Sequence, residues 1–246
     1  MRSKLPWILL MLPSLCAAAA TPEVPLSAGA ILPVSLDHGL DTKKVHAGQA
    51  IRGEIMQDIP GSHVRRRAHI VGQVVSVTAS GIGPAELALR FDAIEQHGRR
   101  IPLGPTSLRA LASFFVVEEA KMPEATMDRG TTPETATTEQ IGGEQVYRGG
   151  GPVASGLETV GVPGPWGAIA RPRPNRQLGC RGEVGGNQPQ ALWLFSTDAC
   201  GLYGFPGLRI AHAGRDDPVG TIVLRSDSGR INLPSGTGIL LRVQQA

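Results

Sequence analysis

The chain has 246 residues, of which 32 are glycine and 20 are proline. Helix-breaking residues at this frequency exclude a long helical bundle or coiled coil. A hydrophobic share of 41% excludes a chain that is disordered throughout. The formal net charge is +3, and without Arg2 and Lys4, which lie in a predicted export signal, 22 basic residues face 21 acidic ones. A nearly neutral chain has no global attraction to phosphate, which argues against nucleic acid as a partner.

Residues 1–20 have the three parts of a secretory signal peptide. Arg2 and Lys4 supply positive charge, Leu5 to Leu15 form a proline-interrupted apolar stretch, and small residues lead to a cleavage site that we place after Ala20. The stretch is shorter than the ~20 residues of a membrane span, although an uncleaved anchor is the alternative. We expect export to the periplasm, the cell envelope or the medium, and no transmembrane span in the mature chain.

Three cysteines are present, and Cys16 would leave with the signal unless it were lipidated. Lipidation would need a small residue before Cys16, where Leu15 stands. The remaining pair, Cys180 and Cys200, predicts a disulfide in an oxidising compartment. The alternatives are a thiol nucleophile acting with His212 or a metal site, but no C-x-x-C or H-x-x-x-H spacing is present. We therefore expect no metal and no cofactor.

Residues 25–117 predict a first β-rich unit. Short apolar or alternating runs separated by glycine and proline are typical of a sandwich or barrel. The clearest run is Ala85 to Phe91, where every second residue is apolar. Over 107–117, Ser107 would cap a short helix, but Phe114 to Val117 favours a strand. Further strands are expected over 28–36, 49–59 and 69–77 and from Arg100 onward.

The rest of the chain predicts a linker and a second unit. Residues 118–152 are rich in Thr, Pro and Glu and poor in large apolar side chains, which is typical of a mobile linker or long loop. Residues 153–246 predict a second β-rich unit that contains the disulfide. The fold class is therefore mainly β, with two small antiparallel barrel or sandwich units joined by a flexible segment after the signal peptide.

Two segments of the chain are similar to each other. LSAGAILPVSL begins at Leu26 and LPSGTGILLRV begins at Leu233; each has a glycine three residues after the leucine and an apolar strand after that. In both, a tight turn would lead into a buried strand. For so short a stretch we favour a chance match, with an internal repeat as the alternative.

Four motifs follow one another between residues 29 and 103. They are Gly29-Ala30-Ile31, Gly48 with Ile51, Ile70-Val71-Gly72, and Gly98 to Leu103. In this order they resemble the β-barrel domain of TrbI-type channel proteins of conjugation and type IV secretion systems. Where that family has a Pro-x-Gly-Ser turn, this chain has Arg65-Arg66-Arg67-Ala68, and nothing after about residue 118 resembles the family. The resemblance implies a barrel-like fold in the cell envelope.

The densest positive charge lies between His63 and His69, at Arg65, Arg66 and Arg67. One interpretation is contact with an anionic partner, such as a lipid headgroup, nucleic acid or an acidic polysaccharide. The other is a solvated turn or an edge strand protected by charge. No aromatic residues are interleaved to stack bases, and we favour the solvated turn.

Aromatic residues gather near Cys200. One interpretation is a binding groove, in which a sugar or peptide stacks on Trp166, Trp193 and Tyr203. The other, which we favour, is a core held together by a disulfide, with Trp193 packed against it. His212 with Asp216 and Asp217 would suggest acid–base catalysis if the groups converged. The sequence GRDDP is more simply a turn. We assign no catalytic residue and no metal ligand.

These observations favour an exported, non-catalytic β-rich protein with a structural or protein-interaction role and envelope proteins as expected partners. The first alternative is a secreted carbohydrate- or ligand-binding module. The second is a secreted hydrolase whose site forms only in the fold. The sequence leaves the enzyme question open and does not identify a ligand.

Overall fold

The computed structural model describes residues 26–79, 83–122, 124–125, 136–143, 145–147, 153–155, 158–164, 167–170 and 192–245. The predicted signal peptide with Ala20, as well as Trp166 and Cys180, lies outside these residues. The described part is mainly β, as predicted, and contains one large sheet, two smaller sheets and one helix. Within it, no helix has the length and apolar character needed to cross a membrane.

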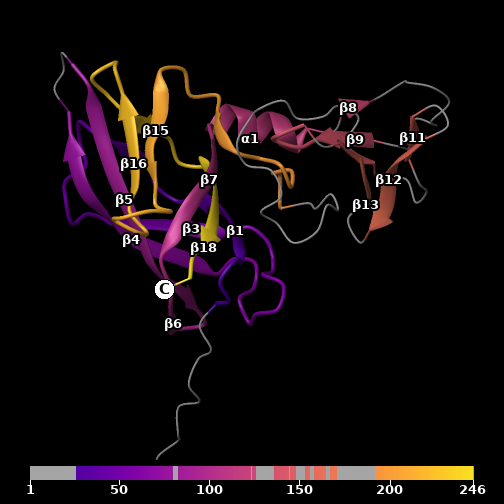
Figure 1. Ribbon diagram of the computed structural model, residues 1–246, viewed down its shortest axis with the longest axis horizontal. Coiled ribbons are helices and arrows are strands. Elements are labelled where there is room, and N and C mark those ends of the chain that lie inside the picture. Colours follow the sequence, from indigo (N-terminus) through magenta and orange to yellow (C-terminus); the bar gives the residue numbers. More distant parts are fainter. Residues whose placement is uncertain are drawn as a thin grey trace, which may run out of the picture.

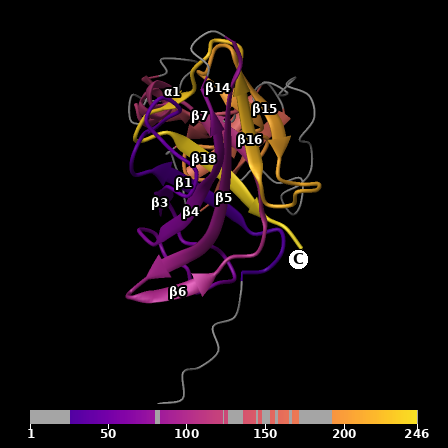
Figure 2. The same cartoon turned by 90° about the vertical axis from the view of Figure 1, so that its left-hand side faces the viewer.

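The large sheet forms the body of the molecule (Figures 1 and 2). All its neighbouring strands are antiparallel except β14 and β7, which are parallel. The last strand in the order, β15, also lies near β14 and β7, so the sheet curls until its two ends approach each other. The order is β14 (Gly201–Tyr203), β7 (Thr106–Ala112), β18 (Gly238–Val243), β1 (Ile31–Leu36), β3 (Ala50–Ile55), β4 (His69–Thr78), β5 (Ala85–Gln96), β16 (Ile222–Ser226) and β15 (Leu208–Ala213), with β6 (Arg99–Pro102) paired to β5.

The first and last strands of the chain, β1 and β18, pair with each other almost symmetrically. Gly29 N–H donates to Val243 O at 2.8 Å, and Gly236 N–H donates to Leu36 O, also at 2.8 Å. Both glycines have a left-handed backbone, with φ of +88° and +79°, which side chains with a Cβ rarely adopt. The two similar sequence segments therefore form the same turn and strand and lie side by side.

The core consists of two apolar clusters on opposite faces of the sheet. Apolar side chains alternate along β18, so that Ile239 and Leu241 enter the larger cluster while Leu240 enters the smaller one. Because β18 is buried on both faces, it reads as a nearly continuous apolar run, whereas β7 is equally buried but includes the polar residues Thr106, Ser107 and Arg109. The larger cluster includes the fully buried side chains Leu32, Val34, Ile55, Ile70, Val74, Leu87 and Leu241, and the smaller one includes Ala110, Val117, Ile141 and Phe195.

Helix α1 (Phe114–Lys121) covers the smaller cluster and corrects two expectations. Residues 114–117 are helical rather than extended, and the capping residue is Ser113 rather than Ser107. The Ser113 side chain accepts the Val116 N–H at 3.4 Å, which satisfies one of the free donors at the helix start. Val117 lies on the buried face of the helix. Its packing and the Ser113 cap therefore outweigh the strand preference of the apolar residues 114–117.

A six-stranded sheet lies beyond α1, at the right of Figure 1. Three of its strands, β8, β9 and β10, come from the predicted linker 118–152, so in its described residues this segment supplies strands. Threonine favours strands because it is β-branched, and the run Ala136–Glu139 contains two threonines. The order is β11 (Val153–Ser155), β12 (Glu158–Gly164), β13 (Gly167–Ala170), β10 (Gln145–Tyr147), β9 (Ala136–Glu139) and β8 (Glu124–Ala125).

The division of the chain also differs from the predicted one. Strands β15, β16 and β18 were expected in a second unit over 153–246, but they complete the large sheet. Ile222 pairs with Leu89, and Leu240 pairs with Pro33. Local patterns identify strands but do not specify partners that are distant in sequence, and this is why the boundary was misplaced.

A two-stranded sheet of β2 (Leu40–Asp41) and β17 (Asn232–Leu233) ties the C-terminal strands to the N-terminal ones. Asp41 accepts two hydrogen bonds from the Arg230 guanidinium, at 3.0 and 2.8 Å. This contact holds the pKa of the Asp41 carboxyl at about 2, although partial burial opposes the shift. The ionised carboxylate is therefore favoured in the folded chain.

The Asp41–Arg230 pair makes stability depend on pH on the acid side. Because the pKa is lower in the folded chain, the pair stabilises the fold above pH ~4 and loses this effect as the pH falls to about 2. We expect Asp41→Asn to cost roughly 1 kcal/mol at pH 7, since the pair is partly exposed. Thermal unfolding of both proteins at pH 7, 4 and 2 would show the difference largely lost at pH 2, where about half of the Asp41 carboxyls in the folded chain are protonated. A difference that is constant over this range would contradict the prediction.

Candidate functional site

The loop that carries Arg65, Arg66 and Arg67 is held against the hairpin of β5 and β6. The Gln96 side chain accepts the Arg65 N–H at 2.7 Å and donates to His63 O at 2.9 Å. The Asp58 carboxylate accepts the Arg66 N–H at 2.8 Å. These bonds fix the loop backbone, while all three arginine side chains are exposed. The segment is thus the solvated turn that the sequence favoured, but it is an ordered one.

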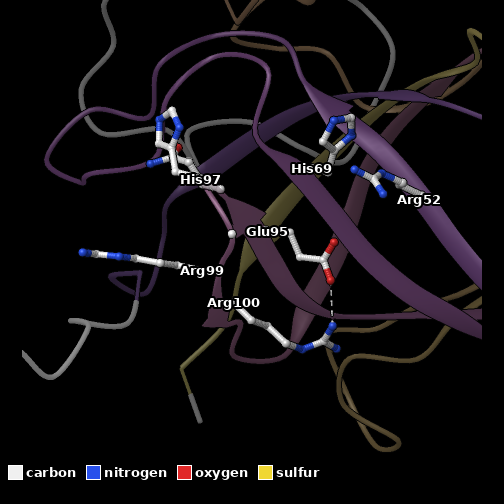
Figure 3. A pocket seen from close by; sticks show the side chains of 8 residues that line it. Arg52, His69, Glu95, His97, Arg99 and Arg100 are labelled. Atoms are coloured by element: carbon white, nitrogen blue, oxygen red, sulfur yellow. Dashed lines mark hydrogen bonds and ion pairs between the residues drawn. The ribbon is translucent and has the colours of Figure 1, made fainter. Parts of the chain in front are cut away.

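A surface hollow of about 350 Å³ lies next to this loop (Figure 3). It lies over a row of cross-strand partners on β4 to β6, in which His69 pairs with Glu95 and Glu95 with Arg100. Next to this row, Glu54 on β3 pairs with His69. Opposite charges at such positions attract each other. The hollow is lined by Arg52, His69, Glu95, Gln96, His97, Gly98, Arg99 and Arg100.

Several lining groups of the hollow are paired. Arg100 Nη1 lies 3.0 Å from Glu95 Oε1, drawn as a dashed line in Figure 3. On the other side, Arg52 Nε and His69 Nδ1 approach the same oxygen of Asp37, at 3.4 and 3.3 Å. Glu95 therefore balances the charge of Arg100, and Asp37 balances that of Arg52 and also faces His69.

Three other arginines keep uncompensated charge. Within the described residues, the side chains of Arg66, Arg67 and Arg99 form no hydrogen bond or ion pair. Arg99 follows the two-residue turn His97-Gly98, whose positive φ values of 50° and 73° are typical of a tight hairpin turn. Figure 3 shows His97 and Arg99 extending from this hairpin. The face thus presents free guanidinium groups from two segments distant in sequence.

The aromatic residues near Cys200 are packed against the smaller core cluster. Trp193 is half-buried, its ring lies 6.2 Å from that of Phe195, and its backbone N–H donates to the side-chain oxygen of Gln57. Tyr203 accepts the Cys200 N–H at its hydroxyl at 3.1 Å. These contacts agree with the structural alternative for the cluster. Cys200 is disulfide-bonded, but because Cys180 lies outside the described residues, their pairing stays a prediction.

The third candidate group does not assemble into an acid–base pair. His212 Nδ1 lies 2.8 Å from Thr221 O and 3.1 Å from Gly214 N, so the ring braces the turn between β15 and β16. Asp216 and Asp217 are exposed in that turn. No group of three or more potential metal ligands occurs among the residues that the structure describes.

Helix α1 carries an exposed apolar surface that sequence reasoning missed. Phe115 is 78% exposed, Met122 65% and Phe114 37%. The rings of Phe114 and Phe115 contact each other edge to face, with centroids 5.7 Å apart. We call Phe114, Phe115 and Met122 the aromatic corner. In the sequence, this surface is signalled by the capping residue Ser113, which is followed directly by Phe114 and Phe115. These two side chains do not belong to the buried face of the helix, which carries Val117 and Ala120.

These observations define a mainly β protein with a basic hollow at the β6 end of its large sheet and an aromatic corner at the α1 end (Figures 1 and 2). Comparisons of the chain with protein-family models, with curated proteins and with solved structures find no match.

Proposed function

We propose that the protein is exported and acts without catalysis, through protein contacts in the cell envelope. The observation that carries this proposal is the exposure of Phe115, at 78%, on a capped and packed helix. Large exposed aromatic side chains on an ordered surface are typical of interface hot spots. Met122, at the C-cap of the same helix, adds a second exposed and adaptable apolar side chain.

Two sequence features support the envelope location. Residues 1–20 have the pattern of an export signal. The motifs that resemble the TrbI-type barrel domain occupy consecutive parts of the large sheet, from the turn before β1 to the β5–β6 hairpin. From this resemblance only the envelope location follows, since one fold hosts many functions.

The test is site-specific photo-crosslinking in cells, followed by fractionation and size analysis. A crosslinking residue at position 115 is compared with one at Val219, which is also apolar and 45% exposed but lies in the β15–β16 turn. We expect position 115, and not position 219, to crosslink to a defined envelope protein.

We further expect Phe115→Ala to weaken the co-fractionation with that partner about tenfold or more, as for a hot-spot residue. Val219→Ala should leave it unchanged. Equal crosslinking at both positions, or a free monomer that co-fractionates with nothing, would overturn the proposal and bring the secreted binding module and the secreted hydrolase forward.

A further inference from the structure

We infer that the basic hollow on β3 to β6 binds a phosphate group. This inference is independent of the proposed protein contacts, because the hollow is lined by residues of β6 and the aromatic corner lies on α1, and these two elements lie at different ends of the molecule (Figures 1 and 2). The hollow combines an excess of positive charge, free hydrogen-bond donors and a concave shape.

Convergence is the first argument. The chain as a whole has 24 basic and 21 acidic residues, yet six arginines from three segments gather at this one end. They are Arg52, Arg65, Arg66, Arg67, Arg99 and Arg100. Four carboxylates face them, on Asp37, Glu54, Asp58 and Glu95. The local balance is therefore positive even with the histidines neutral.

The free donors are the second argument. Three of the four carboxylates, those of Asp37, Asp58 and Glu95, are paired with Arg52, Arg65 and Arg100, at distances of 3.4, 3.5 and 3.0 Å. Arg66, Arg67 and Arg99 have no such partner among the described residues. A guanidinium group carries a planar fork of N–H donors that matches the oxygens of phosphate. Arg99 offers this fork from the lining of the hollow itself.

The third argument is shape and rigidity. The hollow measures about 350 Å³, which leaves room for a phosphate group. It lies over a cross-strand row on β4 to β6, and its rim is a tight hairpin and a loop fixed by Gln96. Donors on rigid elements lose less entropy when they bind. Glu95 is the one carboxylate in the lining, and Arg100 neutralises it.

The phosphate can belong to an anionic lipid headgroup or to a free anion, and the experiment separates these sources. Full-length mature protein is mixed with vesicles of phosphatidylcholine, with or without phosphatidylglycerol, and flotation is measured. In parallel, inorganic phosphate and pyrophosphate are titrated by calorimetry. Each assay is repeated with Arg99→Gln and with Arg209→Gln. Arg209 is an exposed arginine on β15, paired with Asp227, so its loss changes the net charge equally.

We expect Arg99→Gln to weaken binding about fivefold, as for one basic residue near an anionic surface, and Arg209→Gln to leave it unchanged. Binding only to phosphatidylglycerol vesicles assigns the site to a lipid headgroup, whereas binding to the free anions assigns it to a soluble ligand. Equal loss in both variants, or no binding in either assay, would overturn the inference. Circular dichroism of Arg99→Gln controls for folding.

Discussion

Gly72→Ala is expected to destabilise the fold by about 3 kcal/mol or more, and to prevent folding at elevated temperature. A Cβ added at this position would lie 2.0 Å from Arg90 O and 2.8 Å from the Cα of Phe91. Both are backbone atoms of β5, so the clash can be relieved only by separating β4 from β5. The register shifts between Val71 and Gly72, which makes this approach closer than in a regular pair.

The matched control for Gly72→Ala is Gly104→Ala. A Cβ at Gly104 would meet its nearest neighbour, Gln244 O, at 3.7 Å, which is ordinary contact. Since its backbone is not left-handed, alanine there should be neutral or stabilise by up to about 1 kcal/mol. Urea denaturation of the two variants and the parent protein measures the effect. Similar midpoints for Gly72→Ala and the parent would show that the close approach is not a constraint of the fold.

Phe195→Ala is the second substitution with a large expected effect. The side chain is fully buried in the smaller cluster, near Gly238 of β18 and Trp193. Its backbone also bridges to Ile141 and accepts a hydrogen bond from the Gln140 side chain. Removing the ring opens a cavity where β18, α1 and residues 138–141 meet. We expect a loss of about 3–5 kcal/mol and a Tm lower by roughly 10 °C.

Phe115→Ala removes the same atoms from an exposed position and serves as the control. Because Phe115 is 78% exposed, its truncation should change stability by less than about 0.5 kcal/mol. Differential scanning calorimetry of both variants compares them directly. If Phe195→Ala unfolds at the temperature of Phe115→Ala, the smaller cluster contributes little and the role assigned to Phe195 is wrong.

Strands with a clean apolar alternation could be predicted from the sequence. Residues 85–91 form the start of β5, and Ala85, Leu87, Leu89 and Phe91 are buried as expected. The β-branched run at 69–77 corresponds closely to β4. In both cases, local chemistry and the tertiary environment favour the same structure. The mainly β class followed from such runs.

Long-range pairing and the basic hollow could not be predicted. Arg65 is visible as part of a charge cluster, but its neighbour Gln96 lies 31 positions further along the chain. His69 and Glu95 become partners only through the register of β4 and β5, which no local pattern specifies. The helix at Phe114 depends on a cap and on burial of Val117, so its strand-like composition was misleading.

The position of β18 has a consequence for how the chain is made. Strand β18 lies between β7 and β1, so until β18 has been made each of these strands lacks its neighbour on one side, and β1 has only β3 and β7 only β14 beside it. Pairing of chain ends so far apart is slow to nucleate. The large sheet therefore stays incomplete until β18 has been made. A chain cut short before Gly238 would expose two strand edges at once and be prone to aggregation.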